Sequence, residues 1–489
     1  MNPLALDLVR GHESATRFFE SGRETESPIV DRRAVADALK KSNDSFGHDV
    51  RNLVDAWKER RGRAVIAGQQ VGFGGGPLYT LAKLASLLNL AQQGGRDGER
   101  IIPFFWMATE DHDFAEVANL TLQMGGRLRQ FGTTASPTER LPVGGMTVPE
   151  DLRRAVMQAT SLPAEGWLEP GCSFRESFAR LIVSIAGGRV VLVDSLLPEL
   201  RRSGSEMFTR AASRFDELQT AIESRSEEVE RAGYRVQVRP SGGDRYTLFY
   251  EVGANGARRL LESGEDLKQL SIESPERIST AALMRPLLQD LVFEPAAFVG
   301  GPAEVAYYAQ LGEVYRVLGI QRPRVMLRAH ALLIPERFVQ AMGRHGIEPE
   351  EWLDSPEAIL SRRELKREAA LAERIELLKS HVDRELESIR ESILRVDSSL
   401  TRSLNRTSRR IDYHLDVLGR RGRRVISRTD SERFDAVQRF SNVVRPNGVV
   451  QDRIVGWLSH WLLWGNRTLE SVVPHAEPGT DRLSIIGVS

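Results

Sequence analysis

Four ionisable residues follow one another at the end of an apolar run, in the segment WMATEDHDFAE (residues 106–116). They are Glu110, Asp111, His112 and Asp113. Carboxylates and imidazole act as general bases, bind Mg²⁺ or hydrogen-bond an amine or a ribose, so we predict these four residues as catalytic candidates. On an extended strand end, Glu110 and His112 point to one side and Asp111 and Asp113 to the other. A solvated acidic turn without chemistry is the alternative.

The other metal and thiol chemistries find little support. A zinc site needs about three protein ligands, and one local histidine is too few, so no metal ligand set is predicted. Cys172 is the only cysteine, which excludes an intrachain disulfide and a CxxC pair and fits a reducing cytosol. No histidine lies near it in the sequence, so we expect a buried structural cysteine rather than a nucleophile.

A glycine-rich stretch precedes the acidic segment: GQQVGFGGGPLYTLAKL (residues 68–84). Glycines let backbone N–H groups approach a ligand, and a helix N-terminus directly after a strand attracts anions. The spacing matches neither GxGxxG nor a P-loop, so a tight strand-to-helix turn is the alternative. Lys83 is expected to supply a countercharge for a phosphate or carboxylate. The binding candidates here are Gln69, Gln70, Gly72, Gly75, Gly76, Thr80 and Lys83.

The segment FVGGPAEVAYYAQL (298–311) repeats this arrangement of apolar strand, Gly-Gly-Pro and helix. Two such turns predict two helix N-termini at the carboxyl edge of one parallel sheet, where ligands bind in open α/β folds. Glu304 and Tyr307 are three residues apart and share one helix face. Gly300, Gly301, Glu304 and Tyr307 are therefore binding candidates.

Polar residues also precede the second turn, in MRPLLQDLVFEP (284–295). Arg285 can hold a carboxylate or phosphate through two parallel hydrogen bonds, and a structural salt bridge to Asp290 is the alternative. We expect Arg285, Gln289 and Asp290 to line the wall opposite the acidic segment. Arg328, which follows another apolar step, is expected to add charge to the same edge.

The elements that position these residues form an α/β pattern. Apolar runs at 63–70, 100–107, 188–195 and 296–301 predict buried parallel strands, and the spacing at 78–93 predicts a helix between the first two. The more irregular regions 120–170 and 203–280 are interpreted as insertions in the same core.

The pattern of apolar and charged residues changes from about residue 356. Apolar residues recur every three or four positions from Leu371 to Val396, which indicates a coiled-coil seam. Asp397–Ser399 is expected to break the helix and cap a second one through Leu418, so that the two fold back as an antiparallel hairpin. Gly419 and Gly422 are expected to loosen the second helix. The arginine-rich stretch 402–428 reads as a solvated face, with a nucleic-acid arm as the alternative.

The net charge and the lack of long apolar runs limit the kinds of partner that the protein is expected to bind. Basic and acidic residues number 67 each, so the net charge is zero, which argues against attraction to nucleic acid or membrane surfaces. No apolar run of about 18 residues and no signal pattern occurs, and we expect a cytoplasmic protein without a membrane partner.

These motifs in this order, followed by RPNGVVQDR (445–453), resemble the bacillithiol biosynthesis cysteine-adding enzymes over nearly the whole chain. The resemblance implies a Rossmann-like core related to nucleotidylyltransferases and class I aminoacyl-tRNA synthetases, and a coiled coil that mediates a homodimer. It implies a ligase that joins L-cysteine to glucosaminyl malate by an amide bond. On this basis the core comprises 1–120, 171–202 and 281–355, the connecting insertions are 121–170 and 203–280, the coiled coil is 356–443, and 444–489 returns to the core.

A carboxylate is not electrophilic at neutral pH, so amide formation needs activation, most economically by ATP with Mg²⁺; ADP is a further expected nucleotide ligand. The glycine turn lacks the histidines of the HIGH-type motif, which leaves adenylate, acyl-phosphate and nucleotide-independent routes open. Two rival interpretations are a nucleotidyltransferase or synthetase-like enzyme with another acceptor, and a non-enzymatic coiled-coil interaction protein.

Overall fold

The computed structural model describes residues 2–20, 30–95, 98–124, 127–133, 141–160, 166–240, 245–254, 256–344, 346–394 and 401–489. The chain divides into two compact units. The first comprises 1–339 with 451–489 and holds all the sheets; the second comprises 340–450 and is helical. Each unit is described by itself.

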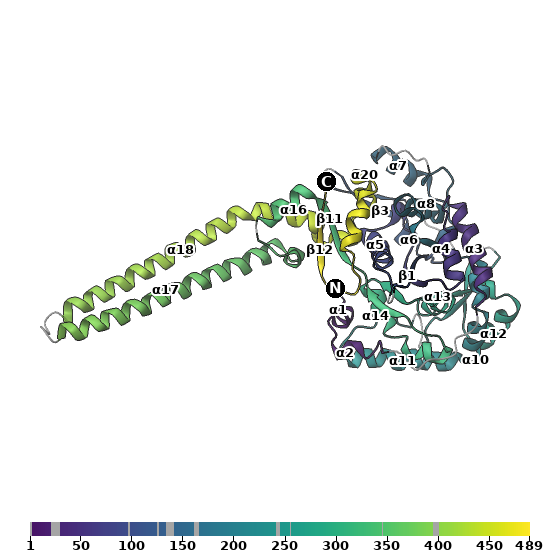
Figure 1. Cartoon of the computed structure of the whole chain (residues 1–489), viewed down its shortest axis with the longest axis horizontal. Coiled ribbons are helices and arrows are strands. Elements are labelled where there is room, and N and C mark those ends of the chain that lie inside the picture. The colour runs from purple at the N-terminus through teal and green to yellow at the C-terminus, as the bar shows by residue number, and fades with distance from the viewer. Residues whose placement is uncertain are drawn as a thin grey trace. The chain divides into compact units, whose positions relative to one another are not determined.

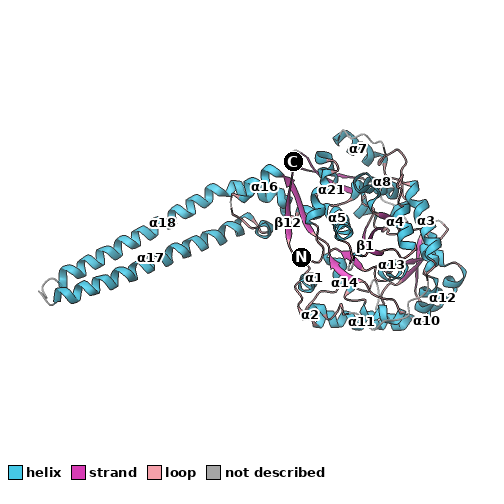
Figure 2. Ribbon diagram, in the orientation of Figure 1, coloured by secondary structure: helices cyan, strands magenta, loops and turns pink. Residues whose placement is uncertain are grey.

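A parallel five-stranded sheet forms the centre of the first unit, in the order β10-β9-β1-β2-β5 (Figure 2). The strands are β1 (Arg63–Gln69), β2 (Ile101–Met107), β5 (Val191–Asp194), β9 (Ala297–Gly300) and β10 (Arg324–Leu327). Alternate residues face opposite sides, and both sides are buried, which explains why the strands read as continuous apolar runs. The predicted Rossmann-like α/β core is confirmed.

Helices cover both faces of the sheet (Figure 1). Ile66, Phe104 and Val193 pack in one apolar cluster and Val65, Phe105 and Leu192 in the other. The first cluster includes side chains of α3 (Arg32–Ser45), α4 (Arg51–Lys58), α9 (Pro198–Ser203), α13 (Arg285–Phe293) and α15 (Gly312–Leu318). The second includes side chains of α5 (Leu78–Gln93), α8 (Phe174–Ala186), α20 (Leu458–Trp464) and α21 (Arg467–Val472).

The two Gly-Gly-Pro turns lie side by side at the carboxyl edge, as predicted. β1 and β9 are parallel neighbours, with Val65 opposite Ala297, and each runs into such a turn. The first leads into α5 and the second into α14 (Pro302–Tyr308). Both helix N-termini therefore face the space beyond the ends of these strands.

The acidic segment departs from its prediction. β2 ends at Met107, and residues 108–113 turn instead of staying extended. The turn is fixed by hydrogen bonds from Ala108 N to Gln69 O (2.9 Å) and from Thr109 N to Met107 O (2.8 Å). The expected alternation of side chains from Glu110 to Asp113 is therefore wrong, because it required a strand.

The remaining elements of the first unit surround this sheet. They are α1 (Pro3–Val9), α2 (Glu13–Thr16), α6 (Phe114–Val117), β3 (Asn119–Met124), β4 (Arg127–Gly132), α7 (Glu150–Thr160), α10 (Ser205–Ser213), α11 (Phe215–Arg231), β6 (Phe249–Val252), β7 (Arg258–Leu261), α12 (Gly264–Glu273), β8 (Ile278–Thr280), β11 (His330–Pro335), α19 (Gln451–Ile454) and β12 (Leu483–Val488). β3 and β4 form a hairpin, and β6, β7 and β8 form a small antiparallel sheet. β12 pairs in parallel with β11, so the C-terminal segment is part of this unit.

Two long helices dominate the second unit: α17 (Pro356–Leu394) and α18 (Thr401–Val444), which pack along each other. The shorter α16 (Glu336–Gly343) precedes them. At one end of the pair, Trp352 is buried and packs edge-on against Phe440 with ring centroids 5.8 Å apart. The break expected at Asp397–Ser399 lies outside the described residues. None of the helices in the described part of the chain has the length and apolar character needed to cross a membrane.

Gly419 and Gly422 do not interrupt α18, contrary to expectation. A Cβ added at Gly422 would lie 2.5 Å from Leu371 Cδ2, and one at Gly419 would lie 3.1 Å from Ile375 Cδ1. The two glycines therefore allow α17 to approach α18 closely. The helical propensity that they lack is offset by this packing.

Candidate active site

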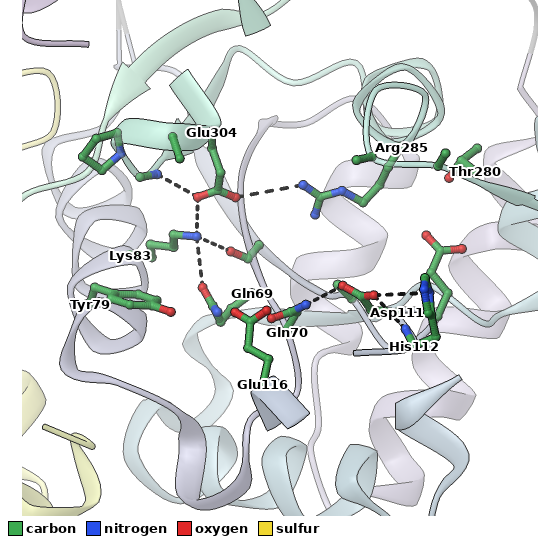
Figure 3. A pocket seen from close by; sticks show the side chains of 18 of the residues that line it. Gln69, Gln70, Tyr79, Lys83, Asp111, His112, Glu116, Thr280, Arg285 and Glu304 are labelled. Atoms are coloured by element: carbon green, nitrogen blue, oxygen red, sulfur yellow. Dashed lines mark hydrogen bonds and ion pairs between the residues drawn. The ribbon is translucent and has the colours of Figure 1, made fainter. Parts of the chain in front are cut away.

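A cavity of about 620 Å³ opens beyond the carboxyl ends of β1, β2 and β9 (Figure 3). The end of β1, the start of α5, the second Gly-Gly-Pro turn, the acidic turn, the small sheet of the second insertion and α19 contribute to its walls. Its charged lining residues are Lys83, Glu110, Asp111, His112, Glu116, Arg258, Arg285, Glu304, Arg328 and Arg453. Gln69, Gln70, Tyr79 and Gly301 complete the polar wall.

Lys83 joins the two helix N-termini at this edge. Its ammonium donates to the carbonyl of Gly68 (2.7 Å) and to Gln69 Oε1 (3.1 Å), and it forms an ion pair with Glu304. The same carboxylate accepts from the backbone N–H of Gly301 (2.7 Å). Burial lowers the pKa of Lys83, and Glu304 opposes that shift. The lysine lines the cavity, but its charge is balanced within the protein.

Arg285 reaches the cavity across the end of β1. Its guanidinium donates to Tyr307 Oη (2.6 Å) and lies 4.0 Å from Glu304. A Cβ added at Gly68 would come within 3.4 Å of Arg285 Nη1, so this glycine gives the guanidinium room beside the strand. The alternative salt bridge to Asp290 is not formed, since that carboxylate is engaged elsewhere.

The acidic turn places its side chains in four different surroundings. Glu110 is buried, accepts from Ser279 Oγ (2.9 Å) and lies 3.5 Å from Arg201. Asp111 accepts from Gln70 Nε2 at the floor of the cavity. Asp113 is the N-cap of α6 and accepts from the N–H of Glu116 (3.1 Å), so it does not line the cavity.

His112 is held by a residue that the sequence did not single out. Arg258, on β7, lies 3.4 Å from His112 Nδ1 and donates to the carbonyls of Glu110 (3.2 Å) and Thr280 (3.1 Å). Its guanidinium stacks on Tyr250, 4.1 Å from the ring centre. The second insertion, 203–280, thus supplies one wall of the cavity. No local sequence motif identifies Arg258 as a candidate.

Arg328 is oriented from the C-terminal segment. Its guanidinium donates to Asp452 Oδ2 (2.8 Å) and to the carbonyl of Ala329 (2.8 Å). His330 Nε2 lies 3.5 Å from the same carboxylate oxygen. Burial raises the pKa of Asp452, but Arg328 and His330 outweigh it and bring the pKa to about 2. Asp452 and its neighbour Arg453 belong to the motif RPNGVVQDR, which carried the resemblance without an assigned role.

Several predicted residues lie away from the main cavity. Gln289 and Asp290 are buried behind it, where Asp290 accepts from Gln289 (3.0 Å) and from Tyr315, and burial raises its pKa to about 7. Thr80 is fully buried, and its hydroxyl has no hydrogen-bond partner. Tyr307 supports Arg285 from behind.

The glycines of the two turns divide between roles. Gly72 and Gly76 line a second, smaller cavity of about 200 Å³ that adjoins the first. Gly75 instead accepts a hydrogen bond from the indole of Trp457 through its carbonyl (2.8 Å). Gly301 lines the main cavity, whereas Gly300 is the last residue of β9 and accepts from the N–H of Arg328 (2.8 Å).

Glu116 and Tyr79 line both cavities; the sequence pointed to Tyr79 as a hydroxyl beside the glycine turn, whereas Glu116 was not a candidate. Partial desolvation raises the pKa of Glu116, and the carboxylates of Asp113 and Asp111 raise it further. Burial raises the pKa of Tyr79 to about 12, with Glu116 and Glu304 adding to the shift. For Glu116, a hydrogen bond from Gln70 and the charge of Lys83 oppose the upward shift.

Metal and thiol chemistry are not evident at this edge. No group of three or more His, Cys, Asp or Glu side chains suited to a metal ion occurs in the residues that the structure describes. Cys172 is buried in the second apolar cluster, and burial raises the pKa of its thiol, as expected for a structural cysteine.

Comparison with known proteins identifies the family. Residues 10–329 match the family model "Bacillithiol biosynthesis BshC, N-terminal Rossmann-like domain", and 331–488 match the model of its C-terminal coiled-coil domain. The chain belongs to this family. Its members include a Koribacter versatilis protein, 30% identical over 451 residues, covering 87% of this chain and 84% of that one.

Two further relatives are less similar, but they align with this chain over nearly its whole length. A Geobacillus kaustophilus protein is 25% identical, with 93% of this chain and 90% of the relative aligned. A Salinibacter ruber protein is 26% identical, with 94% and 89% aligned. All three are named "Putative cysteine ligase BshC". Family membership places the chain among ligases of bacillithiol biosynthesis, as its motifs predicted.

Proposed function

We propose that the protein joins L-cysteine to glucosaminyl malate through an amide bond, which makes a bacillithiol-type thiol. Both substrates carry an amine and carboxylates. The lining of the cavity includes the carboxylates of Asp111 and Glu116 and the guanidinium groups of Arg285, Arg328 and Arg453. The presence of both charges in one cavity is the observation that supports a ligand bearing both signs, and the names of the relatives supply the substrate class.

In the proposed reaction the sugar amine attacks the cysteine carboxyl carbon. A C–N bond forms, one carboxylate oxygen leaves, and the amine loses protons to a base. Asp111 and His112 are the base candidates, because both face the cavity and Glu110 is engaged with Ser279 and Arg201. Arg258 holds His112 in place, so that the imidazole stays directed at the cavity.

A nucleoside triphosphate fits the cationic side of the cavity. Arg285 and Arg328 have planar guanidinium groups, whose several N–H donors suit phosphate oxygens. The phosphates would lie toward these two arginines, and a bound ATP would supply the leaving group for the carboxylate oxygen. We place Mg²⁺ with the phosphates, since that ion commonly takes few protein ligands.

The test is turnover by the purified full-length chain. L-cysteine, glucosaminyl malate and Mg²⁺ are incubated with and without ATP, and products are followed by mass spectrometry. We expect a product that contains both substrates less one water, formed only when both are present. Other amines and amino acids, offered in parallel, should yield none; a product with another acceptor would support the rival interpretation.

Matched variants connect turnover to the cavity. Asp111→Asn is expected to lower kcat by about a hundredfold, the usual size of general acid–base contributions. Asp216→Asn is the control, because Asp216 is an exposed carboxylate on α11 that lines neither cavity. Equal activity of both variants would contradict a role for Asp111.

We further propose that two copies of the chain associate through the coiled-coil unit. α17 and α18 can bury only one face of each helix against the other, yet large apolar side chains stand outside that contact. Leu378, Ile389 and Leu418 are among them. Such side chains on a helical hairpin favour association with a second hairpin.

A further inference from the structure

The smaller cavity stands beside the glycine loop and shares a boundary with the main one. Glu116 and Arg453 line both cavities, so they stand where the two meet. Figure 3 shows the Glu116 side chain pointing up from α6 toward Gln69 and Gln70 at this boundary. The boundary thus carries one carboxylate and one guanidinium.

The smaller cavity has a part of its own that the main cavity does not share. Its apolar side chains there are Pro77, Val117, Leu120 and Ile454, and Asn119 and Thr121 add polar groups beside them. Its volume is about 200 Å³. An apolar cavity of about 150 Å³ accommodates a single benzene ring, so this space suits one small side chain rather than a nucleotide or a sugar.

The walls of this cavity are already formed. The backbone N–H of Gly456 donates to Thr121 O (2.8 Å), and that of Leu78 donates to Val455 O (2.8 Å). A Cβ added at Gly456 would lie 2.7 Å from Leu120 Cδ1, so the segments are packed as closely as glycine permits. A small ligand can therefore bind without rearrangement of these walls.

The charges at the boundary match the backbone of an amino acid. Partial burial raises the pKa of Glu116, and the charges of Asp113 and Asp111 add to the shift against a hydrogen bond from Gln70 and the charge of Lys83, so a bound cation would favour the ionised carboxylate. The exposed Arg453 forms no ion pair with any residue that the structure describes, and its guanidinium can donate hydrogen bonds to a carboxylate. Glu116 thus offers a site for a cation and Arg453 a site for an anion, both at the smaller cavity.

We propose that the smaller cavity is the binding site for the amino-acid substrate. The ammonium of a compact L-α-amino acid binds Glu116, its carboxylate binds Arg453, and its side chain enters the apolar space between Val117 and Ile454. This places the carboxylate at the boundary with the main cavity, where the second substrate binds. The inference rests on the proposed function for the identity of the amino acid, L-cysteine, and adds where it binds and why larger side chains are excluded.

The test measures binding of free amino acids to the full-length chain under reducing conditions by calorimetry. L-cysteine, L-serine and L-alanine should bind, and cysteamine and 3-mercaptopropionate, which each lack one charged group, should bind more weakly by about tenfold or more. Glu116→Gln and Arg453→Met should weaken L-cysteine to a similar extent. Arg482→Ala, in an exposed arginine that lines neither cavity, is the control.

Ile454 lines the smaller cavity and not the main one, so substitutions there act on the smaller cavity alone. Ile454→Phe should raise the KM for L-cysteine by about tenfold, from loss of space, and leave the KM for glucosaminyl malate unchanged. Ile454→Ala should bind L-methionine more tightly than the parent chain does, because the substitution enlarges the cavity. Melting curves confirm that each variant is folded.

The outcomes distinguish this inference from the proposed function. If product forms but Glu116→Gln and Ile454→Phe leave the KM for L-cysteine unchanged, the function stands and the inference is wrong. If small amino acids bind as described but no product forms, the inference stands and the function is wrong. Binding of none of the three amino acids overturns the inference.

Discussion

The ammonium of Lys83 uses all three of its N–H groups within the protein, toward Gly68, Gln69 and Glu304. A lysine in this position of a glycine-rich turn is easily taken for a phosphate ligand. Here its side chain is buried, and it connects the end of β1 to the start of α14. Its contribution is therefore to the geometry of the site.

A double-mutant cycle tests this role. Lys83→Met leaves the Glu304 carboxylate without its main partner, and we expect a loss of about 3 kcal/mol in the free energy of unfolding in urea. In Lys83→Met/Glu304→Gln that carboxylate is also removed, so the double variant should be more stable than the sum of the single variants predicts. Additive losses would contradict a direct pairing of the two side chains.

His460 makes the free energy of unfolding depend on pH, and the direction of that dependence follows from its pKa. Burial lowers the pKa of His460 to about 3, while Nε2 contacts the carbonyl of Leu333 (3.2 Å). The unfolded chain takes up a proton near pH 6.5, and the folded chain does so only near pH 3. The stabilisation is therefore present above pH 6.5 and is lost as the pH falls from there toward 3, by about 1.4 kcal/mol per pH unit.

The prediction is checked by urea unfolding at several pH values between 4 and 7.5. His460→Gln should show a shallower decline of stability with falling pH than the parent chain, because glutamine does not titrate. His475→Gln, at an exposed histidine of the same C-terminal segment, should keep the slope of the parent. The expectation fails if the two variants have the same slope.

At the level of elements, the glycine loop depends on α20, far away in the sequence. Gly75 has φ +83°, and a Cβ there would overlap the indole of Trp457, which donates to the Gly75 carbonyl. We expect Gly75→Ala to lower the free energy of unfolding by about 3 kcal/mol, from strain and from displacement of the indole. It should also weaken L-cysteine binding, because the loop lines the smaller cavity.

Gly145→Ala is the matched control for this substitution. Gly145 has no positive φ, and a Cβ there would meet nothing within 4 Å. Thermal unfolding of the two variants beside the parent separates loop strain from the general effect of replacing glycine by alanine. Equal melting temperatures would show that the loop tolerates a side chain at position 75.

The sequence predicted the sheet well because its signal is local. β1, β2, β5 and β9 are apolar runs, and buried parallel strands produce such runs whatever surrounds them. β10 was recognised only as an apolar step, since it has four residues and an exposed first residue. The two Gly-Gly-Pro turns could likewise be placed at one edge, because parallel strands share that edge.

The orientation of the site side chains could not be predicted in the same way. The Glu110 side chain is buried because it accepts a hydrogen bond from Ser279 and pairs with Arg201, and both residues come from distant segments. Asp290 looked like a wall residue but is buried by Tyr308 and Tyr315. Which member of a polar cluster faces the cavity depends on tertiary contacts, so a local pattern can name the cluster and not the ligand.

At the scale of the whole molecule, the coiled-coil unit raises the question of a second copy. Of its seam residues, Ile375 and Leu404 are buried, whereas Leu378 is 44% exposed and Leu418 is 55% exposed. A stable protein interface buries about 1,200 Å² or more in total, which a pair of helices of this length can supply along its side. The exposed apolar positions are thus accounted for if a second hairpin covers them.

The test is sedimentation equilibrium of the full-length chain over a range of concentrations. The parent should behave as a dimer, and Leu418→Glu/Ile389→Glu should behave as a monomer, because a carboxylate buried without a partner at each position opposes association. Both positions are exposed within one chain, so the fold of the monomer should survive, as circular dichroism can show. Leu463→Glu is the control, since Leu463 is 66% exposed on α20 and belongs to the other unit. A parent chain that stays monomeric, or a control that dissociates as readily as the double variant, would place the contact between copies elsewhere or remove it.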